Sequence, residues 1–529
     1  MRRVSLALGI GFVGGLLATT SPALAQQPAP APTREQLEQS GATIRAIYVT
    51  VDNIFDPNNP EEDKALYRWA NKAHVRTRDS VVRDILLFAP GDKFEARLLD
   101  ESARTLRARG FIADAAVEPG AYDAASNSVD VNVRVRDSWS LSLDLKLNRK
   151  GGQTEWGVGL SDNNLLGTGK TLEVVHESEI DRDHTALGYV DNNVFGSRIQ
   201  LRTSFRNASD GDRRQLAVER PFYALDTRWS LGGNLHSEER IDTMYDLGEE
   251  IDEFGHEINI STLQGGWSRG LVGKRAARWL AGYTSEEHTF SPTTDVPQPL
   301  LLPPNRKLVY PWVGWQLVED DFREMTELNT VGRTEDISLG LNVLASIGFA
   351  DTSYDSDRNA ELLRFDLAKG WEPRGSGLLL MQINGSTRRE DVGYRNSQAS
   401  FSARYYQRNL ERHLFLATLS VLETRHLDPE NQVLLGGDNG LRGYPIRYQA
   451  GESRTILSVE QRFFTDFYPW RLFRVGWAVF ADAGRVGGRD PRATPSQGTL
   501  YDVGAGLRLA SPRASGRNVV HIDLAFPLN

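Results

Sequence analysis

Residues 199–206 read Ile-Gln-Leu-Arg-Thr-Ser-Phe-Arg, with apolar or small side chains alternating with charged or polar ones. Residues 341–349 and 520–526 alternate in the same way. Because successive side chains of a strand point to opposite faces, each stretch predicts a strand with one apolar and one polar face. The polar faces carry full charges and the segments are about ten residues long, which is typical of transmembrane barrels.

The alternation continues through most of residues 138–529. We count about nineteen candidate strands, whereas such barrels usually have an even number. Short turns are expected at 163–169 and 221–223, and longer polar loops at 242–256 and 291–306. A soluble β-sandwich would also alternate, but charged faces and the mixture of short turns with long loops favour an antiparallel barrel in a membrane.

The composition excludes several classes of protein. The 529 residues contain no cysteine, which excludes a disulfide scaffold, thiolate metal sites and a cysteine nucleophile. A formal charge of −9 is too acidic for a chain whose main partner is nucleic acid, so none is expected. A mean hydropathy of −0.42 is incompatible with a bundle of many membrane-spanning helices.

The N-terminus predicts export. Within residues 1–25, two arginines precede the apolar run 4–18, and Ala23-Leu24-Ala25 is a small-x-small cleavage site, as in a secretory signal peptide. The apolar run is shorter than the roughly 20 residues that a spanning helix needs. Residues 26–40 are rich in proline and alanine and predict an unstructured spacer.

Residues 41–137 predict one small α+β domain. A strand is expected at 43–51, and two further strands at 112–118 and 128–136. Between the first two lie three expected helices, which begin near Asn59, near Asp79 and at Phe94. The first helix would place Leu66, Trp69, Ala70 and Ala73 on one face, and the third Leu99, Ala103 and Leu106.

The order of these elements, with Gly110-Phe111 leading the second strand, resembles a POTRA domain. The resemblance implies a periplasmic module that precedes an outer-membrane barrel and binds extended polypeptide by adding a strand to its sheet edge. The alternative is a generic α+β module that serves only as a plug or spacer.

Two motifs resemble catalytic sites but lack the required context. Residues 266–270 match a nucleophile elbow around Ser268, yet that motif needs a strand–turn–helix corner and no helix follows. Residues 167–171 imitate the end of a phosphate loop, but Asn164 stands where its first glycine belongs. No histidine pair has zinc-ligand spacing. We therefore expect no catalytic, cofactor-binding or metal residues, and no enzyme.

Residues 436–445 read Gly-Gly-Asp-Asn-Gly-Leu-Arg-Gly-Tyr-Pro and lie between two predicted strands. Alone, such a loop is usually an exposed connection. The polar faces of the following strands, however, supply candidate partners, which are Glu460, Phe480, Asp482, Gly484, Gly504, Gly506 and Arg508. An arginine inside a barrel needs a carboxylate with fork-like geometry, which Asp482 or Glu460 would give Arg442. Gly443 would let the backbone approach the wall closely.

With these motifs the chain resembles the BamA/TamA family, the bacterial surface-antigen superfamily of outer-membrane insertases and translocases. The resemblance implies a barrel of about 16 strands and a long loop that folds back into it. The surplus of candidate segments leaves two alternatives open, extra strands or parts of extracellular loops, and the barrel could also be one strand short. The loop tip would be Arg442, Gly443 and Tyr444, and its acidic partners on the wall Asp482 and Glu460. The chain departs from the family in having a single POTRA-like module and in ending on Asn529 rather than on an aromatic residue.

The resemblance implies a non-enzymatic protein of the outer membrane, with its N-terminal domain in the periplasm, that helps to insert or translocate polypeptides. Its partners would be membrane lipid and unfolded polypeptides, the latter bound through residues 41–137. A two-partner-type secretion pore and a passive channel remain alternatives.

The end of the chain predicts an unusual seam. Four strands are expected after the long loop, at 454–464, 472–482, 501–509 and 519–526, where the family has five. If the final strand is missing, the first and last barrel strands run in the same direction where they meet. Lipid requires every backbone group to find a partner, so such a seam is a weak point of the barrel.

Overall fold

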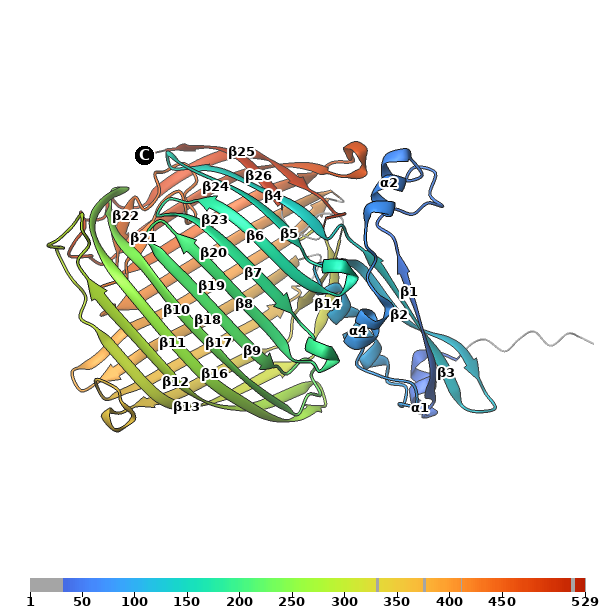
Figure 1. Ribbon diagram of the computed structural model, residues 1–529. Coiled ribbons are helices and arrows are strands. Elements are labelled where there is room, and N and C mark those ends of the chain that lie inside the picture. Colours follow the sequence, from blue (N-terminus) through green and yellow to red (C-terminus); the bar gives the residue numbers. More distant parts are fainter. Residues whose placement is uncertain (1–31, 330–332, 374–376, 411, 515–518, 529) are drawn as a thin grey trace, which may run out of the picture.

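The alternating segments pair into a closed barrel in the computed structural model of the protein (Figure 1), which describes residues 32–329, 333–373, 377–410, 412–514 and 519–528. The predicted signal peptide lies outside the described residues. The barrel strands are β4 (Leu141–Lys150), β5 (Gln153–Asp162), β6 (Lys170–Ser178), β7 (Asp183–Asp191), β8 (Gln200–Ala208), β9 (Gly211–Arg220), β10 (Trp229–Asp246), β11 (Glu249–Val272), β12 (Arg275–Ser291), β13 (Arg306–Glu319), β16 (Asn342–Ala350), β17 (Ala360–Trp371), β18 (Gly377–Glu390), β19 (Gly393–Leu410), β20 (His413–Arg425), β23 (Ser453–Phe464), β24 (Arg474–Gly487), β25 (Leu500–Ala510) and β26 (Val519–Pro527).

The barrel has 19 strands in the described chain, more than the expected number of about 16. The reason is that each candidate segment pairs with its neighbours, instead of some forming loops. Residues 242–256, expected to be a loop, extend the long hairpin of β10 and β11, whose paired residues run from Trp229–Trp267 to Asp246–Glu249.

The first and last barrel strands run in the same direction, as the sequence predicts. Every consecutive pair is antiparallel and the number of strands is odd, so β4 and β26 are parallel where the barrel closes. We call this contact the seam. Just before the two strands, Trp139 and Ala514 form a parallel bridge, and the Trp139 N–H donates to the Arg513 carbonyl at 2.7 Å.

The outward faces of the seam strands are apolar. On β4, Leu143, Leu145 and Leu147 are exposed, and on β26 the side chains of Ile522 and Leu524 are exposed as well. Leucine at these positions is expected where a strand faces lipid.

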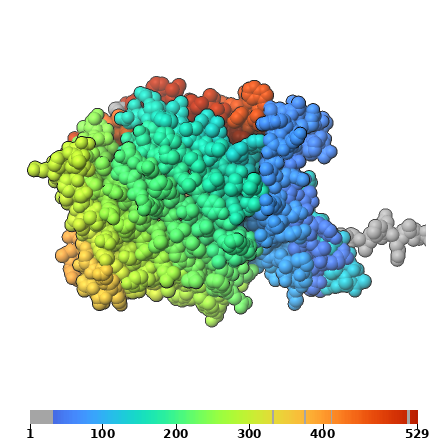
Figure 2. All heavy atoms as spheres, viewed as in Figure 1, coloured from blue at the N-terminus to red at the C-terminus, as the bar shows by residue number. Residues whose placement is uncertain are grey.

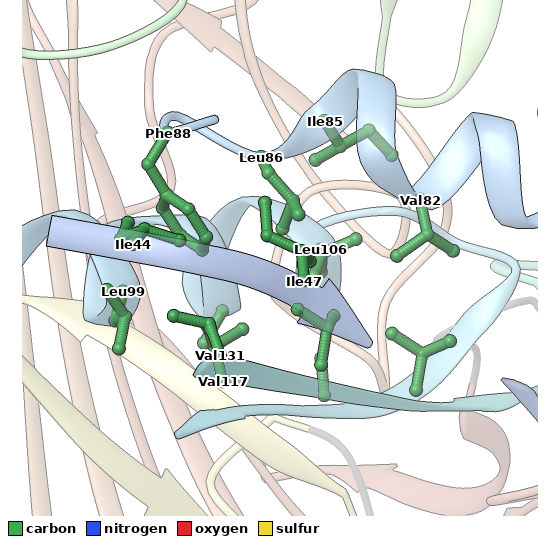
Figure 3. Packing of buried hydrophobic residues seen from close by; sticks show 14 of the residues in the cluster. Ile44, Ile47, Val82, Ile85, Leu86, Phe88, Leu99, Leu106, Val117 and Val131 are labelled. Atoms are coloured by element: carbon green, nitrogen blue, oxygen red, sulfur yellow. The ribbon is translucent and has the colours of Figure 1, made fainter. Parts of the chain in front are cut away.

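The N-terminal domain consists of four helices and a three-stranded sheet. Its elements are α1 (Arg34–Gln39), β1 (Thr43–Asp52), α2 (Ala65–Ala73), α3 (Asp79–Ile85), α4 (Ala96–Arg107), β2 (Ile112–Asp123) and β3 (Ser128–Asp137). The strand order is β1-β3-β2, with β1 parallel and β2 antiparallel to β3. Figure 3 shows the core, where Ile44 and Ile47 of β1 meet Leu99 and Leu106 of α4. No described helix is long and apolar enough to cross a membrane.

Two parts of this domain differ from the prediction. Helix α1 lies within the expected spacer, where Thr33 caps it and Leu37 anchors it in the core. Helix α2 begins at Ala65 rather than near Asn59, and it buries Tyr67 instead of the predicted face. Leu66 and Trp69 of that face are 52% and 63% exposed.

The N-terminal domain covers one end of the barrel, which we call the domain end (Figures 1 and 2). Arginines of α4 pair with carboxylates at that end. Two of these pairs reach connections beside the barrel strands, Arg97–Asp226 and Arg104–Asp320 (3.2 Å), and two reach short strands between β13 and β16, Arg107–Asp336 (2.5 Å) and Arg107–Glu324 (2.7 Å). The β5–β6 turn also joins the domain, since the Arg78 N–H donates to the Gly167 carbonyl at 3.0 Å.

Candidate functional site: an inward loop beside the seam

The long loop between β20 and β23 enters the barrel. It spans residues 426–452, contains the short strands β21 (Val433–Leu435) and β22 (Gln449–Gly451), and is called the inward loop below. Leu435, Leu441 and Tyr444 are buried together with Ile456, Val486 and Leu500 of the wall. This apolar contact holds the loop against the inner faces of β23, β24 and β25.

The tip residue Arg442 forms a bidentate ion pair with Asp482. Its Nε lies 2.8 Å from Asp482 Oδ2 and its Nη2 lies 3.0 Å from Oδ1, the fork geometry that the sequence predicts. The guanidinium also lies 3.3 Å from the centroid of the Phe480 ring. Burial opposes the charge, but the Asp482 and Glu460 carboxylates outweigh it and hold the pKa of Arg442 above its ordinary value.

The next two tip residues fix the backbone. The Gly443 N–H donates to Asp502 Oδ2 at 3.0 Å, and the Tyr444 hydroxyl donates to the Tyr501 carbonyl at 3.1 Å. A Cβ at Gly443 would lie 2.9 Å from both Asp502 Cβ and the Pro527 nitrogen. Only glycine therefore fits at this contact between loop and wall.

The remaining predicted wall residues lie around the tip. Glu460 accepts from Arg442 Nη1 at 3.2 Å and from Arg508 Nη2 at 3.1 Å. Gly504 pairs with Phe480 across the strands, and a Cβ there would overlap the ring that supports Arg442. A Cβ at Gly484 would lie 3.1 Å from Leu441 of the loop.

Two carboxylates of the site were not predicted. Asp523 of β26 accepts from Arg442 Nη1 at 3.2 Å and also pairs with Arg508. It fits because Gly506, opposite it on β25, leaves room for its side chain. Asp502 binds the tip backbone as described above. The available signal was their position on the polar faces of the last two strands: Asp502 shares a face with Gly504, Gly506 and Arg508 on β25, and Asp523 shares a face with His521 on β26.

The inward loop contacts both sides of the seam. It reaches β26 through Arg442–Asp523 and through the close approach of Gly443 to Pro527. On the other side, Gly151 in the β4–β5 turn lies so close to Pro445 and Ile446 that a Cβ would overlap their backbone. The loop thus spans the inner side of the only parallel pair among the described barrel strands.

A second segment closes the domain end of the lumen. Between β13 and β16, the strands β14 (Phe322–Thr326) and β15 (Thr334–Ser338) form a hairpin, called the lumen hairpin below. Leu328 beside β14 is buried against Tyr406 and Leu414 on the inner wall. The Tyr406 hydroxyl donates to Asn329 Oδ1 at 2.9 Å.

A chain of contacts connects the N-terminal domain to the loop tip. Arg107 of α4 pairs with the lumen hairpin through Asp336. At the other end of the hairpin, Arg462 Nη1 donates to the Leu328 carbonyl at 2.9 Å, and its Nε donates to Glu460 Oε1 at 2.8 Å. Glu460 in turn binds Arg442. The domain, hairpin, wall and loop therefore form one continuous network.

Residues 266–270 do not form the strand–turn–helix corner of a nucleophile elbow. Ser268 lies within β11, is fully buried, and donates its hydroxyl to the Ala277 carbonyl of the neighbouring strand at 2.8 Å. The described chain contains no group of three or more histidine or carboxylate side chains placed to hold a metal ion.

The fold and site define a class of protein: a transmembrane barrel with a loop folded into its lumen and a small α+β domain at one end. Residues 388–529 match the Omp85 superfamily domain, and residues 72–137 match the POTRA family described as the surface antigen variable number repeat. The chain therefore carries an Omp85 superfamily domain and a POTRA domain, as the resemblance to the BamA/TamA family implies.

Solved structures of similar proteins include BamA from Haemophilus ducreyi lacking POTRA domains 1–3, with 13% identity over 91% of this chain and 81% of that one, at a TM-score of 0.38. CdiB from Acinetobacter baumannii has 11% identity, covers 92% and 74% of the two chains, and has a TM-score of 0.43. CdiB from Escherichia coli has 13% identity, covers 97% and 89%, and has a TM-score of 0.39. No curated protein matches the chain.

Proposed function

We propose that the protein inserts or translocates polypeptides at the outer membrane, with its POTRA domain in the periplasm. It would do so without making or breaking covalent bonds. The observation that carries the proposal is the contrast between lumen and seam. The lumen holds the inward loop and the lumen hairpin, whereas the barrel closes through a parallel pair of strands. A parallel pair is slightly less stable per residue than an antiparallel pair, so the seam would be the weaker boundary and the place where a client strand could enter.

The POTRA domain would deliver the client. Its sheet order leaves β1 and β2 as edges, and an extended polypeptide can add a strand to such an edge. On β2, Arg107 Nη1 donates to the Ala115 carbonyl at 3.0 Å and Arg34 Nη2 to the Val117 carbonyl at 3.1 Å. A client strand would compete for these carbonyls. It would thereby loosen Arg107, which also holds the lumen hairpin.

A secretion pore is the second candidate, and a cavity in the lumen favours it. The cavity has a volume of about 590 Å³ and is lined by both charged and apolar side chains, among them Arg202, Glu219, Arg364, Trp312 and Leu344. An extended chain could pass such a surface once the inward loop and the lumen hairpin had moved. A passive channel is less consistent with two segments that close the lumen.

Purified full-length protein in liposomes separates these functions. Faster folding of an added, unfolded barrel client supports the insertase. Protection of a dedicated exported partner inside the vesicles supports the secretion pore. Ion conductance without either effect would contradict the proposal and indicate a channel. Ser268→Ala serves as a control, because its buried hydroxyl bonds, within the described residues, only to Ala277 and Gly270, on β12 and β11, and its loss should change none of these readouts.

A further inference from the structure

Exposed apolar side chains gather where the POTRA domain meets the rim of the barrel. Helix α2 exposes Leu66 and Trp69, and the turn between β23 and β24 exposes Phe467, Trp470 and Phe473. The two segments touch, since the Tyr67 hydroxyl donates to the Trp470 carbonyl at 2.6 Å. Figure 1 shows α2 beside the orange-red turn that precedes β24, on the side of the barrel that carries β25, β26 and β4. We call these five side chains the rim patch.

The rim patch lies just on the periplasmic side of the expected membrane boundary. Trp477, on the outward face of β24, stacks on Phe463 with ring centroids 3.7 Å apart, and such aromatic residues mark the interface of a transmembrane barrel. Phe473 is four residues nearer the turn, about 10 Å along the axis for a tilted strand. This depth corresponds to the headgroup layer on the periplasmic side.

A basic pocket opens beside the rim patch. It has a volume of about 470 Å³ and is lined by Arg136, Arg471, Arg474 and Arg513 with Asp466, Tyr468 and Pro512. Arg471 pairs with Glu61 and Glu62 of the POTRA domain, and Arg513 pairs with Glu62. Arg136 has no ion-pair partner among the described residues, and the buried Nε of Arg474 has no hydrogen-bond partner there. The pocket therefore holds more positive charge than its own carboxylates neutralise.

We propose that the rim patch and the basic pocket together bind an anionic phospholipid of the periplasmic leaflet. The phosphate would accept hydrogen bonds from Arg136 and Arg474, and the aromatic side chains would lie among the glycerol and upper acyl groups. A lipid fits better than a protein partner because the apolar patch and the surplus cations occur together at headgroup depth. Binding there would fix α2 and the POTRA domain at the side of the barrel that contains the seam.

The position of α2 can be tested with a single label, because the chain has no cysteine. Full-length Leu66→Cys with an environment-sensitive fluorophore is reconstituted in vesicles of phosphatidylethanolamine and phosphatidylglycerol. We expect quenching by nitroxide-labelled lipids and protection from iodide. Tyr48→Cys is the matched control: Tyr48 is 56% exposed on β1 of the same domain and should show the opposite pattern. If iodide quenches the label at position 66 as strongly as a label at position 48, the proposal is overturned. Protection of the label at position 66 from iodide without quenching by nitroxide lipids would also overturn it, because it would indicate a protein partner.

The headgroup contact needs a separate measurement. In Arg136→Gln/Arg474→Gln, phosphatidylglycerol bound to the protein in native mass spectrometry should fall roughly 25-fold, as the product of about fivefold for each lost charge. Arg134→Gln is the control, because Arg134 lies on the same strand, is largely exposed and pairs with Asp52. Excess inorganic phosphate should displace little lipid. If excess inorganic phosphate displaces most of the bound lipid, the site binds free anions. If the double variant binds as much lipid as the parent, the two arginines do not contact the headgroup. Either result overturns the proposal.

Discussion

Arg442 is surrounded by acidic groups from three different strands. Glu460 lies on β23, Asp482 on β24 and Asp523 on β26, and all three accept hydrogen bonds from its guanidinium. A buried ion pair adds little net stability compared with an apolar contact, but removal of one partner leaves the other charge buried and uncompensated. The ion pairs of Arg442 therefore specify a single docked position of the inward loop.

Arg442→Ala should destabilise the barrel by about 3–5 kcal/mol, because the Asp482 side chain is fully buried and would lose its partner. The heat-modified gel shift should occur at a lower temperature than in the parent. Arg214→Ala is the matched control, since Arg214 is 72% exposed on its side chain and should leave the transition unchanged. An unchanged transition in Arg442→Ala would mean that the loop lies in solvent.

Gly443→Val should detach the tip while leaving Arg442 itself intact. The added Cβ would press on Asp502 and on the backbone of Pro527, and such overpacking costs about 1–3 kcal/mol. The measurement is protease cleavage of the loop in intact cells or vesicles, which should become faster. Gly188→Val offers a control, because a Cβ there would make only ordinary van der Waals contacts, the nearest with Glu173 at 3.7 Å. Equal cleavage of parent and Gly443→Val would contradict the tight contact.

At the residue scale, the sequence predicted the partners that have a local signature. Phe480-x-Asp482-x-Gly484 and Gly504-x-Gly506 have the two-residue spacing of one strand face, so their side chains could be placed on the wall. Asp502 and Asp523 could not be chosen in this way. They are single carboxylates on polar faces, and their role depends on which strands neighbour them and on how deep the loop tip reaches.

At the scale of elements, the lumen hairpin was not predicted as a separate unit. Its two strands are five residues each, Phe322–Thr326 and Thr334–Ser338, and short strands of this kind resemble an ordinary polar turn in sequence. The start of α2 was also misplaced. The Glu62 carboxylate accepts the Asp56 N–H and pairs with Arg513 of the barrel, so a tertiary contact replaces the predicted first turn of the helix.

Arg107→Glu should open the domain end of the lumen. The reversed charge would face Asp336 and Glu324, and like charges in place of a nearly buried ion pair would release the lumen hairpin. In planar bilayers we expect higher and more variable conductance than for the parent. Arg134→Glu, an exposed change on the same domain, controls for altered net charge. Parental conductance in Arg107→Glu would show that the hairpin closes the lumen independently of the POTRA domain.

At the scale of the whole molecule, the alternation of the sequence was sufficient to predict a barrel, the two-part organisation and the direction of its last strand. The count of about nineteen alternating segments agrees with the 19 strands of the described barrel, whereas the family resemblance alone favoured about 16. The strand number determines how the barrel closes. An odd number of strands forces β4 and β26 to be parallel, and the inward loop spans that contact from inside.

The most direct test of the proposed seam mechanism is a reversible disulfide across the seam, called the seam lock below. Trp139 and Ala514 form a parallel bridge, so Trp139→Cys/Ala514→Cys should form a disulfide in a chain without other cysteines. Ser204→Cys/Gln215→Cys is the matched control, because these residues are paired between β8 and β9, away from the seam. In liposomes, the oxidised seam lock should abolish accelerated folding of a barrel client, reduction should restore it, and the control should remain active. Full activity of the oxidised seam lock would contradict the account.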